Sequence, residues 1–126
     1  MKGTTSDIPI QLSQNCAIAS IQIDLTEAVI LEFRKNLLSF VHESGATAVI
    51  LDVSGVEIMD VDDFHSIKHT ISMVKILGAF AVISGLKPGV VASLIELGAD
   101  IKDIEAALNL DEAFQLVNDR RLDSNL

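Results

Sequence analysis

Hydrophobic and polar residues alternate along the first part of the chain. Apolar side chains occupy every second position in residues 8–12 and in residues 17–23, which is the period of strands with one covered face. Beyond residue 23 the apolar spacing changes to three or four, as on one face of a helix. The helical positions are Ile30, Phe33, Leu37 and Val41. Asp24 and Glu27 fit a helix N-cap and its partner, and Gly45 fits the helix end. The pattern predicts a hairpin followed by a helix.

Two nearly continuous apolar runs predict strands that are buried on both faces. They are residues 46–53, which read ATAVILDV, and residues 79–84. A helix that ends at Gly78 is predicted between them. Its apolar face consists of Phe64, Ile67, Ile71 and Val74. After the second run, Pro88 stands where a helix can begin without losing a needed N–H, and residues 90–97 continue this third helix.

The remaining segments complete an α/β pattern. We expect a short strand near residues 101–105, a last helix over residues 111–117, and a polar end from Arg120. Strands separated by helices of this length imply right-handed crossovers between parallel strands, and the opening hairpin adds an antiparallel pair. The sequence therefore predicts a mixed sheet of four to five strands with about four helices packed mainly on one face.

A length of 126 residues fits one domain. We expect it to span residues 1–126, with a core at about residues 8–117 and flexible segments at residues 1–7 and 118–126. Hydrophobic residues make up 49% of the chain. No apolar run approaches the roughly 20 residues that a membrane helix requires, and residues 1–7 do not resemble a signal sequence. We therefore expect a cytoplasmic protein without a membrane partner.

The charge of the chain argues against nucleic acid as a partner. The sequence has 18 acidic and 9 basic residues, for a net charge of −9, whereas a phosphate backbone requires a basic face. All aromatic residues are phenylalanine and amount to 4%, which leaves little for base stacking. Cys16 is the single cysteine, so no intrachain disulfide can form, and we interpret it as a small core or edge side chain. We expect no cofactor.

The segment VEIMDVDDFHSIKH (residues 56–69) carries the densest candidate chemistry: Asp60, Asp62, Asp63, His65 and His69. A calcium loop that starts at Asp60 would need a glycine at its sixth position and a carboxylate at its twelfth, where this chain has His65 and Ile71. A zinc site built on His65 and His69, with Asp62 one turn earlier, lacks the general-base glutamate of HExxH and a further ligand. We therefore expect no metal site.

Phosphotransfer chemistry also fits this segment poorly. Asp60 and Asp62, as a nucleophile and acid pair, would have to follow a buried strand directly, but the strand is predicted to end several residues earlier. Asp52, at the end of that strand, would as a phosphoacceptor need acidic partners after the first strand and a lysine after the last, and the sequence provides neither. We therefore expect no catalytic residues and no enzymatic activity.

A helix start explains the acidic residues better. Asp60, Asp62 and Asp63 stand where the exposed N–H groups of the second helix need acceptors and where the helix dipole favours negative charge, worth about 0.3–1 kcal/mol each. A phosphate group is also tolerated at such a helix end. The residue beside the cap is therefore a potential switch.

Three motifs in this order of elements resemble the STAS domain of anti-sigma-factor antagonists, and within that family the small single-domain subunit of the stressosome. They are ILDVSGVEIMD, KILGA and GLKPGVVASLIELGADI, and the resemblance covers about residues 8–117. It implies a non-catalytic scaffold that assembles with long sensory STAS paralogues into a large particle and sequesters a switch serine kinase, with a serine phosphatase as a further partner. The alternative is a stand-alone antagonist that binds an anti-sigma kinase one-to-one. Met73 and Ile76, left over from the core face of the second helix, are consistent with a subunit contact.

In this family an aspartate at the position of Asp60 is followed by a serine or threonine that a partner kinase phosphorylates. This chain has Val61, which has no hydroxyl, and this argues against the one-to-one antagonist. The protein is then either a constitutive scaffold or has a switch elsewhere. Asp62 and Asp63 would supply part of the charge of a phosphate. Ser93 would replace the missing hydroxyl, because it lies close to where the long paralogues carry a second phosphorylated threonine.

Overall fold

The computed structural model describes residues 8–124, and the first seven residues, expected to be flexible, lie outside this range. It contains five strands and four helices. Their order is β1 (Ile10–Ser13), β2 (Cys16–Ser20), α1 (Glu27–Ser44), β3 (Ala48–Asp52), α2 (Val61–Ile76), β4 (Phe80–Ser84), α3 (Pro88–Glu96), β5 (Ala106–Ala107) and α4 (Leu110–Ser124). None of the helices in residues 8–124 is long and apolar enough to cross a membrane.

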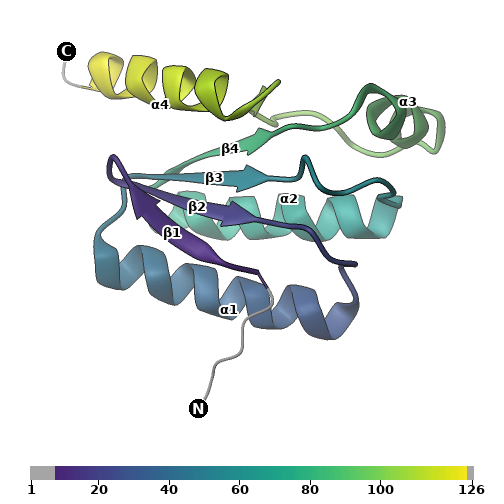
Figure 1. Cartoon of the computed structure of the whole chain (residues 1–126), viewed down its shortest axis with the longest axis horizontal. Coiled ribbons are helices and arrows are strands. Elements are labelled where there is room, and N and C mark those ends of the chain that lie inside the picture. Colours follow the sequence, from purple (N-terminus) through teal and green to yellow (C-terminus); the bar gives the residue numbers. More distant parts are fainter. Residues whose placement is uncertain (1–7, 125–126) are drawn as a thin grey trace.

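The strands form one mixed sheet in the order β1-β2-β3-β4-β5. The hairpin of β1 and β2 is antiparallel, and every other neighbouring pair is parallel, which confirms the predicted α/β class. Gln14 and Asn15 form the hairpin turn with positive φ angles of 52° and 65°, as a two-residue turn requires. Because β2, β3 and β4 are parallel, the loops that follow them meet at one edge of the sheet (Figure 1).

The helices cover the two faces of the sheet unequally. Figure 1 shows α1 and α2 along one face and α4 along the other. The larger core includes Phe33 and Leu37 of α1, Phe64 and Ile67 of α2, and Leu94 of α3. The smaller core lies under α4. The helices therefore pack mainly on one face, as predicted, and α4 covers the other.

The predicted N-cap of the first helix and the predicted position of the last strand are wrong. The N-cap of α1 is Thr26 and not Asp24, because the Thr26 hydroxyl accepts a hydrogen bond from the Val29 N–H at 3.3 Å. The strand expected near residues 101–105 is the two-residue β5 instead. Asp103, with φ at 63°, turns the chain just before β5, so only two residues reach β4 in pairing register.

The last helix is longer than predicted. α4 continues to Ser124 and does not end near Val117, and two arginines beyond Val117 contact the sheet side of the fold. The Arg120 guanidinium lies 4.4 Å from the centre of the Phe80 ring, and Arg121 donates a hydrogen bond to the Thr47 hydroxyl at 2.9 Å. Residues 118–124, which the sequence analysis expects to be flexible, are therefore part of α4, and residues 125–126 lie outside the described range.

Candidate functional site

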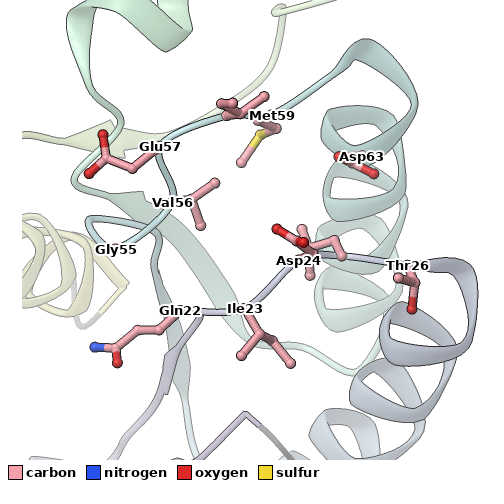
Figure 2. Close-up of a pocket in the computed structure, with 11 residues that line it drawn as sticks. Gln22, Ile23, Asp24, Thr26, Gly55, Val56, Glu57, Met59 and Asp63 are labelled. Carbon is pink, nitrogen blue, oxygen red and sulfur yellow. The ribbon is translucent and has the colours of Figure 1, made fainter.

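A pocket of about 410 Å³ opens at the edge of the sheet where β2 and β3 end. Its walls come from the loop before α1, the loop before α2 and the first turn of α2 (Figure 2). It combines carboxylates with apolar side chains. The carboxylates are those of Asp24, Glu57 and Asp63, and the apolar side chains include Ile23, Val56 and Met59. This acidic and apolar lining is suited to a protein partner with basic and apolar side chains.

Beside this pocket, α2 begins with a reciprocal cap. Asp60 is the N-cap residue, and its Oδ1 accepts a hydrogen bond from the Asp63 N–H at 2.7 Å. In return, the Asp60 N–H donates to Asp63 Oδ2 at 3.5 Å. This pair forms a capping box, which confirms the predicted helix-start role for Asp60 and Asp63. Asp62 is exposed in the first turn, where it contributes charge without taking part in the box.

The Asp63 carboxyl is less acidic than an ordinary aspartate. Partial burial raises its pKa, and the neighbouring charges of Asp60 and Asp62 raise it further, against the opposing effect of the backbone hydrogen bond from Asp60. The folded state therefore favours the protonated form of Asp63 more than the unfolded chain does. This contribution to stability is present below the ordinary aspartate range and is lost as the pH rises through the raised pKa.

The surface next to the cap is apolar as well as acidic. Val61 is the first residue of α2 and packs half-buried against the larger core. Ile58 precedes the cap and is 87% exposed, although Met59 between them is buried. We refer to Ile58, Asp60, Val61 and Asp62 as the α2-start surface. It has the composition of a contact surface and has no hydroxyl group of its own.

Helix α3 is joined to the same edge of the sheet. Lys87 is its N-cap residue, and the Lys87 Nζ forms an ion pair with Glu57 in the loop before α2. Ser93 lies on α3 and is exposed. Ser93, the alternative candidate for phosphorylation, is therefore accessible, and the helix that carries it is tied at its start to the loop that leads into α2.

His65 and Asp52 have structural partners. His65 Nε2 accepts a hydrogen bond from the Asp100 N–H at 3.2 Å, and the Lys68 Nζ lies 3.0 Å from Asp100 Oδ2. These contacts hold the loop after α3 against α2, and the hydrogen bond from Lys68 lowers the pKa of Asp100. His69 is exposed, and Asp52 Oδ1 accepts from the Ser54 N–H at 3.0 Å. Residues 8–124 hold no group of three or more His, Cys, Asp or Glu side chains arranged for a metal ion.

Two variants distinguish the stability that the hydrogen bond of the Asp60 cap provides from the stability that its negative charge provides. We expect Asp60→Ala to lower the free energy of unfolding by about 0.5–2 kcal/mol, because the Asp63 N–H loses its acceptor. Asp62→Ala removes the same charge from the exposed first turn and serves as the matched control, with an expected change within about 0.5 kcal/mol. Urea unfolding measures both values. Equal losses in the two variants would mean that helix-dipole charge, and not the capping box, stabilises the start of α2.

Comparison with known proteins gives a consistent result. The model of the STAS domain family matches residues 7–113. The curated relatives include two Bacillus subtilis proteins, the RsbT co-antagonist protein RsbRA, 26% identical over 81 residues, and the RsbT co-antagonist protein RsbRB, 25% identical over 104 residues. The matches cover 64% and 82% of this chain but only 30% and 38% of those relatives, so the chain matches well under half of their length.

Solved structures match over a larger share of both chains. A serine-to-glutamate variant of RsbS from Moorella thermoacetica is 25% identical, with a TM-score of 0.73 over 90% of this chain and 99% of that chain. A chain from a study of the molecular architecture of the stressosome has a TM-score of 0.75 at 22% identity over 90% of this chain and 98% of that chain, a likeness of fold alone.

Proposed function

The chain belongs to the STAS domain family, as its motifs predicted, and from this premise we propose that it is a non-catalytic scaffold and antagonist in a stressosome-type signalling complex. In this proposal it assembles with long sensory STAS paralogues in the cytoplasm and sequesters a switch serine kinase. The observation that carries the proposal is the match to RsbS over nearly the full length of both chains. The relatives named as RsbT co-antagonists support the same assignment.

The α2-start surface supports partner binding that does not depend on phosphorylation. Val61 has no hydroxyl, so a kinase cannot modify this position. The Asp60 and Asp63 carboxylates are engaged in the capping box, which leaves Asp62 as the exposed carboxylate of the first turn that takes no part in it. One exposed carboxylate is a poor substitute for a phosphate dianion with three acceptor oxygens. We therefore propose that this surface binds its kinase partner constitutively, through Ile58 and the adjacent acidic pocket.

A second apolar surface is a candidate contact between subunits. A groove of about 360 Å³ lies between the last turns of α1 and α2, and its apolar lining is Leu38, Met73, Ile76 and Leu77. Ile76 is 84% exposed, which is costly for an aliphatic side chain unless another molecule covers it. Met73 and Ile76, the two residues that the sequence analysis associates with a subunit contact, both line this groove.

The native mass of the protein tests the proposal. We expect that co-expression with a long STAS paralogue gives a discrete particle of megadalton scale that contains both chains, measured by light scattering and ultracentrifugation. Ile76→Asp is expected to prevent assembly because it places a charge in the apolar groove. The matched control is Ser72→Asp, which adds the same charge at an exposed position one turn earlier on α2. A stable monomer or dimer, both for the protein alone and after co-expression, would overturn the proposed scaffold role and favour a one-to-one antagonist.

A further inference from the structure

A separate pocket lies at the opposite edge of the sheet, where β3 and β4 begin. It has a volume of about 480 Å³, and the C-terminal half of α4 lines one side of it. Figure 1 shows the C-terminal end of α4 at the side of the sheet away from α3 and from the start of α2. The lining of this pocket includes Thr47, Ala48, Phe80, Val117, Arg120 and Arg121. Polar groups of Asn15, Thr47 and the two arginines stand beside apolar side chains in a space of several hundred Å³, which is large enough for a small molecule that has a charged and an apolar end.

The Arg121 guanidinium is held in this pocket by neutral groups. Its Nη2 donates to the Thr47 hydroxyl at 2.9 Å and lies 3.6 Å from the Cys16 sulfur. Burial raises the pKa of the Cys16 thiol, although the Arg121 charge acts in the opposite direction, so this group stays neutral and provides no counter-charge. Arg121 forms no ion pair with any residue in the described range, although the chain has 18 acidic residues.

Arg120 adds a second positive charge at the same place. Its guanidinium lies 4.4 Å from the centre of the Phe80 ring, which fixes its position beside the pocket. The Arg120 Nη2 also forms an ion pair with Glu105 Oε1 at 3.6 Å, and both side chains are about half exposed. The sequence has three arginines, and two of them line this pocket. Because Arg120 is paired with Glu105, Arg121 is the arginine of this pocket that is left to bind an anion.

We propose that this pocket binds a small organic anion, a carboxylate or a phosphate ester that carries an apolar group. The anionic end would lie against the Arg121 guanidinium and the Thr47 hydroxyl, because a guanidinium presents several N–H donors in a plane that matches carboxylate and phosphate oxygens. The apolar part would lie against Phe80 and Val117. This pocket and the α2-start surface lie at opposite edges of the sheet and share no residue, so the anion site does not rest on the proposed partner binding.

Titrations followed by nuclear magnetic resonance of the full chain test this site with four probes. Phenyl phosphate and benzoate distinguish the two anions, benzyl alcohol provides the apolar group without charge, and inorganic phosphate provides charge without the apolar group. We expect saturable shifts of the amide signals of Ala48, Phe80 and Val117 with at least one aromatic anion. Benzyl alcohol and inorganic phosphate are expected to bind at least about tenfold more weakly, since each lacks one half of the recognised group.

Variants locate the binding. Arg121→Gln is expected to weaken it at least about tenfold, and Arg121→Lys, which keeps the charge but not the planar fork, is expected to weaken it less. Lys35→Gln removes one charge from an exposed position of α1 and is expected to leave binding unchanged. Absence of saturable shifts in the full chain, or equal binding by Lys35→Gln and Arg121→Gln, would overturn the proposal. If Arg121→Gln is unfolded by circular dichroism, Arg121→Lys decides alone, and unchanged affinity in that variant rejects the assigned contact.

Discussion

Replacing Gly85 by alanine is expected to lower the free energy of unfolding by about 2–5 kcal/mol, because two costs add at this position. The backbone of Gly85 has φ at +84°, which is unfavourable for an L side chain, and a Cβ there would lie 2.8 Å from the Cβ of Ser54. The neighbouring Ser54 backbone leaves no room either, since its Cα and N would both lie 3.1 Å away. Urea unfolding with the linear extrapolation measures the loss.

Gly78→Ala is the matched control. Gly78 has φ at +93°, but a Cβ built on it meets no heavy atom within 4 Å. Only the backbone cost of about 1–2 kcal/mol is therefore expected. Ser54→Gly in the Gly85→Ala background removes the shortest contact and should recover part of the difference. Equal losses at the two glycines, without recovery, would show that the loops relax and that their close approach does not stabilise the fold.

The contact of Ser54 with Gly85 also matters for the candidate site. Ser54 is the second residue of the loop that leads from β3 into α2, and Gly85 begins the loop that leads from β4 into α3. The Val53 N–H donates to the Ser84 carbonyl at 2.9 Å, and the Gly85 N–H donates to the Ala107 carbonyl at 3.0 Å. The loops are therefore packed together where they leave the sheet. A side chain at residue 85 should displace the α2-start surface relative to α3.

The elements that the sequence predicts well are those whose evidence is local. The core face of α2 was predicted from a spacing of three or four, and its four predicted positions are all buried. The buried runs are β3 and β4, because a strand covered on both faces needs apolar residues at nearly every position. The cap at Asp60 was also predictable, since its partner Asp63 stands only three residues away.

Features that depend on distant partners could not be predicted. Arg121 is part of a polar segment that resembles a frayed end, and its partner Thr47 is separated from it by 74 residues. The ion pair of Lys87 with Glu57 spans 30 residues, and no local spacing indicates it. The N-cap of α1 was ambiguous for another reason. Asp24 and Thr26 both have side-chain acceptors, and only the backbone path of the loop selects Thr26.

We expect Val61→Ser to convert the protein into a kinase substrate. The new hydroxyl would stand at the first residue of α2, directly after the Asp60 cap, where a helix N-terminus stabilises a phosphate. The variant should fold, because Val61 is only half-buried and its loss should cost about 1 kcal/mol of apolar burial. Intact mass after incubation with ATP and the switch kinase that accompanies a long STAS paralogue should increase by one phosphate group.

Control proteins decide what such a mass increase means. Val61→Ala makes a similar cavity without a hydroxyl and should stay unmodified, which excludes phosphorylation caused by loosening of α2. The original chain reports on Ser93, which is exposed on α3, and a phosphate that disappears in Ser93→Ala would show that the switch has moved to that helix.

No mass change in Val61→Ser would mean that residue 61 does not occupy the acceptor position of the family, or that Asp62 repels the incoming phosphate. Val61→Ser combined with Asp62→Asn separates these two explanations, because only the second predicts that phosphorylation appears when the neighbouring charge is removed.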